Sequence, residues 1–347
     1  MQAVMYEAFG APLEVREAPD PVAPSGGVVI RVEATGLCRS DWHGWQGHDA
    51  DITVFPHVPG HELAGTVAEL GPGVTGWKPG ARVTVPFVCA CGRCRSCLNG
   101  DQQVCENQTQ PGFTHWGSFA EYVVIENADV NLVGMPDEMA FTTAAGLGCR
   151  FATAFRAVVA QGRVAPGEWV AVHGCGGVGL SAVMIAAAAG ARVIAVDVSA
   201  ASLDLASRLG AVATVDASET DAATAVRDIS EGGVQVSLDA LGSPATARAS
   251  IAGLRRRGRH VQVGLLPTAA GRADLPMELV IAHELEILGS HGMAAHAYGP
   301  MMAMVRAGTL RPDLLVSRTI GLGDAPAALA AMNTPGVTMI VPPRHPM

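Results

Sequence analysis

The sequence predicts an α/β protein with two domains, one mostly β and one built on a doubly wound parallel sheet. Three observations lead to this class. At 347 residues the chain exceeds the length that one hydrophobic core usually serves. Hydrophobic residues make up 49% of the chain and charged residues 16%, which is typical of a folded globular protein. The residue pattern also changes near Arg150, from strands and turns to alternating strands and helices.

The first 150 residues form the predicted mostly-β domain. Strand patterns at 28–34, 63–70 and 81–85 are separated by turns rich in Gly and Pro, such as 71–73 and 78–80. We therefore expect short strands joined by long loops in this part of the chain.

Strand and helix patterns alternate from 151 to about 290. Predicted strands cover 169–173, 192–196, 234–238 and 259–263, and predicted helices cover 177–189, 200–209, 222–229 and 245–254. This alternation predicts a parallel sheet with right-handed crossovers. After about 290 the pattern is less regular, with one helical run at 298–307.

Charge and hydropathy exclude several classes of partner. The formal net charge of −9 argues against a broad phosphate-binding face, so nucleic acid is not an expected partner. The start, Met1-Gln2-Ala3-Val4, lacks the basic and apolar segments of a secretory signal. The uncharged stretch 169–191 is long enough to span a membrane, but its central glycines favour a strand, a turn and a helix. We therefore expect a cytoplasmic protein with no membrane partner.

A glycine-rich motif joins the first predicted strand and helix of the second domain. Gly174-Cys175-Gly176-Gly177-Val178-Gly179 satisfies G-x-G-x-x-G in the context that supports dinucleotide binding. Gly174 permits a tight turn, Gly176 lets the backbone approach a pyrophosphate, and Gly179 allows the helix to pack on the strand. The helix N-terminus would then face the phosphates with its partial positive charge.

Asp197 ends the next predicted strand and indicates which dinucleotide is bound. A carboxylate at this place can accept both ribose hydroxyls of the adenosine half and would repel a 2′-phosphate. No Arg or Lys follows at 198–202 to offset that repulsion. The sequence therefore predicts NAD rather than NADP, the alternative being that Asp197 merely caps a helix.

Four cysteines with short spacing predict a structural metal site. The pattern Cys91-x2-Cys94-x2-Cys97-x7-Cys105 can close a tetrahedral all-sulfur site with no open position, which is typical of structural zinc. Disulfides are not expected in a cytoplasmic chain. A nucleic-acid-binding zinc ribbon is disfavoured because Arg93 and Arg95 are the only cations nearby, and iron–sulfur ligation remains possible by spacing.

A second group of metal-binding residue types begins at Gly36-Leu37-Cys38-Arg39-Ser40-Asp41-Trp42-His43. Gly60-His61-Glu62 follows shortly, and Cys149 lies much further along the chain. A lone cysteine is usually a core residue, but Cys, His and a third Cys or carboxylate form the ligand set of catalytic zinc sites. We expect Cys38, His61 and Cys149 to hold a zinc that polarises an alcohol or carbonyl oxygen.

Together with Gly146-Leu147-Gly148-Cys149, these motifs resemble the zinc-dependent alcohol dehydrogenases of the medium-chain dehydrogenase/reductase superfamily, across essentially the whole chain. The resemblance implies a GroES-like catalytic domain over 1–150 with a structural-zinc lobe at about 87–106. It implies a Rossmann NAD-binding domain over 151–290 and a return to the catalytic domain over 291–347. It also implies two Zn²⁺ ions per subunit and a homodimer or homotetramer.

The resemblance further implies catalytic roles for four residues. Ser40 takes the proton from the bound alcohol, and His43 is the outer end of that relay. Asp41 orients the zinc-bound histidine, as also expected on physical grounds. Glu62 is a carboxylate near the metal that can join its coordination transiently.

The remaining implied contacts concern cofactor and substrate. The expected cofactor-binding residues include Arg39 at the pyrophosphate, and Thr153 and Val178 beside the nicotinamide. The others are the glycines of the glycine-rich motif, Gly177 among them, together with Asp197, Val263 and Leu265. Phe87, Trp116 and Leu265 are the expected pocket residues, and their apolar character favours simple alcohols, aldehydes and ketones. Thr338 departs from the family, because many relatives have a second pyrophosphate arginine there.

The function expected from these features is NAD-linked, reversible hydride transfer between primary or secondary alcohols and aldehydes or ketones. Rival hypotheses are a polyol, formaldehyde or amino-alcohol dehydrogenase of the same superfamily, and a non-catalytic scaffold that binds NAD and zinc. A scaffold would gain nothing from Ser40 and His43, so these two residues favour an enzyme.

Overall fold

The computed structural model describes residues 1–266, 274–332 and 335–343, and the chain divides into two compact units. The first unit comprises Met1–Ala152, Gly292–Met302 and Pro312–Met347. The second comprises Thr153–His291 and Ala303–Arg311.

The first unit is mostly β. Its main sheet has the strand order β14-β15-β3-β4-β5-β7, with β6 paired to β3, and β1 and β2 form a separate two-stranded sheet. Apart from the parallel pair β14–β15, its strands pair antiparallel. The strands are β1 (Gln2–Met5), β2 (Glu14–Glu17), β3 (Val28–Gly36), β4 (Glu62–Leu70), β5 (Arg82–Thr84), β6 (Tyr122–Ile125), β7 (Val133–Gly134), β14 (Val316–Gly321) and β15 (Val337–Val341).

Short helices connect these strands. They are α1 (Arg39–Trp45), α2 (Arg95–Leu98), η1 (Gln102–Val104), α3 (Ala128–Asn131), α4 (Phe141–Ala145), the π-helical turn η2 (Leu147–Phe151), η5 (Ala295–Ala297), η6 (Pro312–Leu315), η7 (Leu322–Asp324) and α12 (Ala325–Ala331). Helix α11 (Tyr298–Arg306) has residues in both units.

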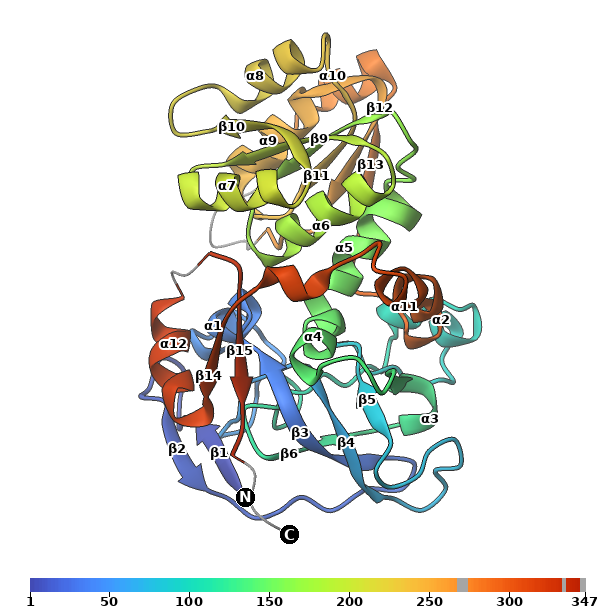
Figure 1. Ribbon diagram of the computed structural model, residues 1–347, viewed down its shortest axis with the longest axis vertical. Coiled ribbons are helices and arrows are strands. Elements are labelled where there is room, and N and C mark those ends of the chain that lie inside the picture. Colours follow the sequence, from blue (N-terminus) through green and yellow to red (C-terminus); the bar gives the residue numbers. More distant parts are fainter. Residues whose placement is uncertain (267–273, 333–334, 344–347) are drawn as a thin grey trace. The chain divides into compact units, whose positions relative to one another are not determined.

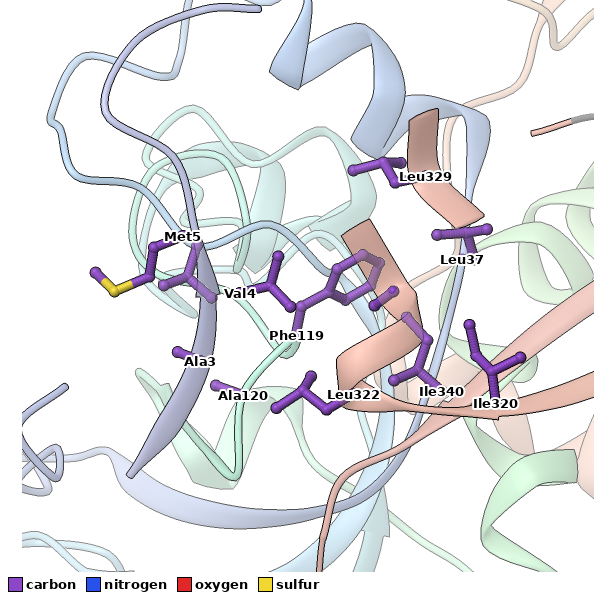
Figure 2. Close-up of a cluster of buried hydrophobic side chains, with 12 residues drawn as sticks. Ala3, Val4, Met5, Leu37, Phe119, Ala120, Ile320, Leu322, Leu329 and Ile340 are labelled. Carbon is purple, nitrogen blue, oxygen red and sulfur yellow. The ribbon is translucent and has the colours of Figure 1, made fainter. Parts of the chain in front are cut away.

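The core of the first unit joins the two ends of the chain. Figure 2 shows Phe119 between Val4 of β1 and Ile340 of β15, within one cluster of buried side chains. Leu329 of α12 belongs to the same cluster and is fully buried. Burial of this apolar surface therefore stabilises the packing of the C-terminal segment against the N-terminal strand.

The second unit is a doubly wound α/β sheet (Figure 1). Its six strands are parallel and have the order β10-β9-β8-β11-β12-β13. Numbered from β8, this is the order 3-2-1-4-5-6 of the dinucleotide-binding fold, with the ligand crevice at the carboxyl ends where the order reverses. The strands are β8 (Trp169–His173), β9 (Arg192–Asp197), β10 (Ala211–Asp216), β11 (Val234–Asp239), β12 (Leu254–Gln262) and β13 (Glu286–Gly289).

Helices follow the strands as right-handed crossovers require, with α6 and α7 on one face of the sheet and α8 and α9 on the other (Figure 1). The helices are α5 (Ala152–Arg156), the π-helical turn η3 (Ala157–Gln161), α6 (Gly177–Ala188), α7 (Ala200–Arg208), α8 (Ala222–Ile229), α9 (Pro244–Ala252) and α10 (Met277–His283). Among the described residues no helix has both the length and the apolar character needed to cross a bilayer.

The predicted fold class is confirmed, and the predicted strand at 169–173 and helix at 222–229 have the observed bounds. Strands β10 and β13, which form the two edges of the parallel sheet, were not predicted from the sequence. Edge strands are less buried than central ones, so neither carries the continuous apolar run of a central parallel strand.

Candidate active site

Three predicted ligands that are far apart in sequence meet in the first unit. Cys38 immediately precedes α1, His61 immediately precedes β4, and Cys149 lies on the π-helical turn η2. One ligand atom from each of these residues and one from Glu62 all lie within 4.8 Å of one another. Inserted π-helical turns occur frequently at functional sites.

The His61 ring shows that this cluster fits a metal ion. Its Nδ1 lies 2.8 Å from an oxygen of Asp41, which fixes the proton on that nitrogen. Its Nε2 is buried and has no hydrogen-bond partner among the described residues. A buried polar atom without a partner is costly, and a metal ion beside the two sulfurs would supply a partner for this nitrogen.

Asp41 fixes the geometry around this histidine. Its carboxylate also accepts the backbone N–H groups of Cys38 at 3.0 Å and Gly60 at 3.1 Å. Its exposed fraction is 1%. The residue predicted to orient the zinc-bound histidine therefore contacts two ligand segments at once.

The two thiols are electrostatically unequal. The Cys149 thiol, and after it His61, hold the pKa of Cys38 well below its usual range despite burial. Cys38 in turn raises the pKa of Cys149 well above its usual range, and burial adds to the effect. Both residues would bind a divalent cation as thiolates, so metal binding here would release protons.

Glu62 is close to the ligands but is held by Arg150. The Glu62 carboxylate accepts from the Arg150 backbone N–H at 3.0 Å and from Nε at 2.8 Å, and it forms an ion pair with Nη2. Burial raises the pKa of Glu62, with Arg150 opposing the shift. Arg150 was not predicted as a site residue.

The predicted proton relay begins beside Cys38. The Ser40 hydroxyl oxygen lies 3.9 Å from the Cys38 sulfur. Nδ1 of His43 lies 3.0 Å from Nδ1 of the exposed His48, so one of these two rings donates to the other. Burial, followed by repulsion from His48 and Arg39, lowers the pKa of His43. His48 was not predicted as a site residue.

Arg39 is exposed at the start of α1. Its guanidinium donates to the Met332 carbonyl oxygen at 3.1 Å and lies 5.5 Å from the centre of the Trp42 ring. Its predicted contact with a pyrophosphate stays a prediction.

Two phenylalanines border the His61 ring. The ring centre of Phe87 lies 6.2 Å away and that of Phe113 lies 5.4 Å away, both in edge-to-face orientation. Phe113 was not predicted. Trp116 donates from Nε1 to the Pro56 carbonyl oxygen and packs against the core cluster of Figure 2, so its predicted place in the pocket stays a prediction.

The four cysteines of the predicted lobe also converge. The sulfur of Cys94 lies 3.4 Å from that of Cys97 and 3.7 Å from that of Cys105, and Cys91 lies 4.0 Å from Cys97. A tetrahedral zinc ion with bonds of about 2.3 Å requires sulfur separations of about 3.8 Å. Backbone N–H groups of Cys91, Cys94 and Asn107 donate to sulfurs of the cluster, as thiolates require. These residues fit a closed zinc site.

The glycine turn of the second unit leaves room for a phosphate. A Cβ on Gly179 would collide with the Gly174 carbonyl oxygen, whereas a Cβ on Gly176 would meet no atom of residues 1–266, 274–332 or 335–343 within 4 Å. Gly176 caps the N-terminus of α6, which contains Gly177 and the half-buried Val178. The open space beside Gly176 fits a cofactor pyrophosphate.

Asp197 lies against this turn at the end of β9. Its carboxylate accepts the N–H of Cys175 at 2.6 Å and that of Ser199 at 2.9 Å. The helix-cap alternative is weakened, because the side chain of Ser199 caps α7.

Three further predicted contacts lie in the second unit. Thr153 is buried, and its hydroxyl has no hydrogen-bond partner in the described part of the chain. The N–H of Val263 donates to the Asp239 carbonyl oxygen just past the end of β12, and Leu265 is 65% exposed. Their roles toward a cofactor or substrate stay predictions.

Comparison with known proteins agrees with this architecture. The profile of the family "Alcohol dehydrogenase GroES-like domain" matches residues 24–137, and that of "Zinc-binding dehydrogenase" matches residues 177–307. An alcohol dehydrogenase of Geobacillus stearothermophilus is 37% identical over 291 residues, and one of Rhizobium meliloti (strain 1021) is 37% identical over 292. Each alignment covers 84% of this chain and 84% of the relative.

A solved structure described as an NAD-dependent alcohol dehydrogenase superposes with a TM-score of 0.88 at 32% identity. The match covers 98% of this chain and 99% of that chain. The protein therefore belongs to the zinc-dependent alcohol dehydrogenases of the medium-chain dehydrogenase/reductase superfamily, and it is an oxidoreductase.

Proposed function

We propose that this protein is an NAD-dependent alcohol dehydrogenase whose catalytic zinc is held by Cys38, His61 and Cys149. The observation that carries the proposal is the buried Nε2 of His61, which lies beside the two thiols and has no hydrogen-bond partner in the part of the chain that the structure describes. Three protein ligands leave a fourth position for substrate, as in catalytic zinc sites. A second zinc belongs to Cys91, Cys94, Cys97 and Cys105 and has a structural role.

The protein residues divide the chemistry between them. A zinc ion at the first site would supply a Lewis acid that polarises the substrate oxygen, and NAD would supply the hydride acceptor. Ser40 takes the proton of the alcohol, because its hydroxyl lies beside Cys38. His43 and its neighbour His48 then give the proton a route to solvent.

The substrate class follows from the apolar residues beside His61. Phe87 and Phe113 offer hydrocarbon surface and no hydrogen bonds to a substrate carbon chain. Such a wall favours simple primary or secondary alcohols over polyols, whose hydroxyls would lose hydrogen bonds to water. The second unit binds the cofactor, and Asp197 at the glycine turn disfavours the 2′-phosphate of NADP.

The remaining parts of the proposal concern the whole molecule. The catalytic domain comprises 1–150 and 291–347, and the cofactor domain comprises 151–290. All eight cysteines are free thiols, which suits the reducing cytoplasm. The enzyme assembles as a homodimer or homotetramer, as its resemblance to the family implies.

An activity screen with NAD over primary, secondary, aromatic and polyol substrates tests the proposal. We expect turnover of simple alcohols with NAD and little with NADP. Ser40→Ala should lower kcat by about 100-fold or more, because general acid–base transfer contributes that much, while NAD binding measured by fluorescence stays intact. Polyol preference would contradict the substrate class, and loss of NAD binding in Ser40→Ala would assign Ser40 to the cofactor.

A further inference from the structure

Arg150 is a buried cation at the metal site whose role neither the motifs nor the proposed mechanism explains. Its side chain is 8% exposed, and that of Glu62 is fully buried. Besides the two side-chain contacts to Glu62, its Nη1 donates to the Leu37 carbonyl oxygen at 2.9 Å. The Arg150 guanidinium is therefore bound to Leu37, which precedes Cys38, and Arg150 itself follows Cys149 in the sequence.

The missing side chain of Gly36 leaves the space that the Arg150–Glu62 ion pair occupies. Gly36 pairs with Glu62 across β3 and β4. A Cβ on Gly36 would overlap an oxygen of Glu62 and would lie 2.6 Å from Nη2 of Arg150. Any other residue at position 36 would displace the ion pair, so the pair in this position requires a glycine there.

Without Arg150, Glu62 has another partner within reach. Its carboxylate oxygen lies within 4.8 Å of the ligand atoms of Cys38, His61 and Cys149. A buried carboxylate that loses its cation carries a large desolvation cost. A metal ion with an open position would relieve that cost, since carboxylate oxygens are good zinc ligands.

We propose that Arg150 is a positioning residue that holds Glu62 away from the open coordination position, so that a substrate oxygen can occupy it. This inference rests on the metal site of the proposed function. The two-point contact of Arg150 keeps both carboxylate oxygens directed at the guanidinium. Removal of the cation alone should close the site, and removal of both charges should reopen it.

Imidazole binding to the Co²⁺-substituted protein tests this without turnover or NAD. The visible Co²⁺ bands change only at a site with an open position, so the closed cysteine lobe adds no imidazole-dependent signal. In Arg150→Met we expect imidazole affinity to fall by about 10- to 100-fold, the usual effect of changing a partner of a metal ligand. In Glu62→Gln/Arg150→Met we expect affinity within about twofold of the wild-type protein.

The Arg259–Glu168 pair in the second unit supplies a matched control. It is a partly buried ion pair with an N–O distance of 2.5 Å, and no predicted metal ligand belongs to it. Arg259→Gln should leave the Co²⁺ spectrum and imidazole affinity unchanged. An equal loss of affinity in Arg259→Gln would mean that general destabilisation causes the effect, which would overturn the inference.

Other results separate the two proposals. If imidazole does not change the Co²⁺ spectrum of the wild-type protein, the proposed metal site itself is refuted. Wild-type affinity in Arg150→Met, or no recovery in the double variant, would refute only the role of Arg150. If Arg150→Met does not fold, Arg150→Lys replaces it. In Arg150→Lys, a smaller loss of imidazole affinity that is absent from Glu62→Gln/Arg150→Lys would support the inference. Wild-type imidazole affinity in Arg150→Lys would overturn it.

Discussion

Two groups of four metal-binding side chains lie in the same unit but are built in different ways. The four cysteines of the lobe come from 15 consecutive residues, and two of them are partly exposed. Cys38, His61, Glu62 and Cys149 come from three distant segments, and all except Cys149 are buried as whole residues. Only the second group mixes sulfur, nitrogen and oxygen.

Their surroundings differ as much as their ligands. The lobe sulfurs accept backbone N–H groups of the lobe itself. The distant group is held by charged side chains, Asp41 on His61 and Arg150 on Glu62. A local, closed site can stabilise a loop but leaves no position for substrate. The distant group, if it holds zinc through three ligands as we propose, has to keep a fourth position open and therefore needs supporting residues.

Substitution of a ligand in the distant group should have the largest effect. In His61→Ala we expect kcat/KM to fall by at least about 1,000-fold, because metal-ion catalysis contributes several kcal/mol. Metal analysis should find one zinc lost per chain and the lobe zinc retained. Near wild-type activity with one zinc per chain would show that the distant group is not the reactive site.

Loss of the supporting carboxylate should have the next largest effect. Asp41→Asn keeps the size of the side chain but removes its charge from His61 Nδ1. We expect zinc affinity of the distant group to fall by about 10- to 100-fold, measured by competition with a chelator. The lobe zinc should be released at the wild-type rate, and a change there instead would break the proposed distinction.

Substitution in the lobe should affect structure more than chemistry. Cys97 is buried and contacts Cys91 and Cys94. In Cys97→Ser we expect loss of one zinc and local unfolding, since structural zinc contributes about 10 kcal/mol or more to the folding of small zinc modules. Limited proteolysis should cut within 87–106 while activity falls less than in His61→Ala. Greater loss of activity than in His61→Ala would contradict a purely structural role.

The same contrast explains what the sequence could predict. Cysteines that are close together in sequence must also be close together in space, so the metal site of the lobe could be predicted from residue types and spacing alone. The central strands and the glycine turn followed from apolar runs and from the G-x-G-x-x-G context. The distant ligands were recognised by residue type, but their contacts with Asp41 and Ser40 were implied by the family resemblance.

Arg150 and Phe113 could not be predicted in this way. Arg150 contacts Glu62 across 88 positions of sequence, and no spacing rule joins two residues that only the fold brings together. A charged residue next to a predicted ligand was the one available signal for Arg150. Phe113 reads as an ordinary core aromatic, and its contact with His61 appears only in three dimensions.

The smallest expected effect concerns the proton route that we propose for the distant group. Burial, then His48 and Arg39, lower the pKa of His43 below 6.5, and a bound zinc ion would act in the same direction. Neutral imidazole accepts the proton, so for alcohol oxidation the acid limb of log kcat/KM should lie below pH 6.5. His48→Gln can preserve a hydrogen bond to His43 but removes one repelling charge. The limb should therefore move toward higher pH by less than about one unit, and a shift toward lower pH would contradict the repulsion.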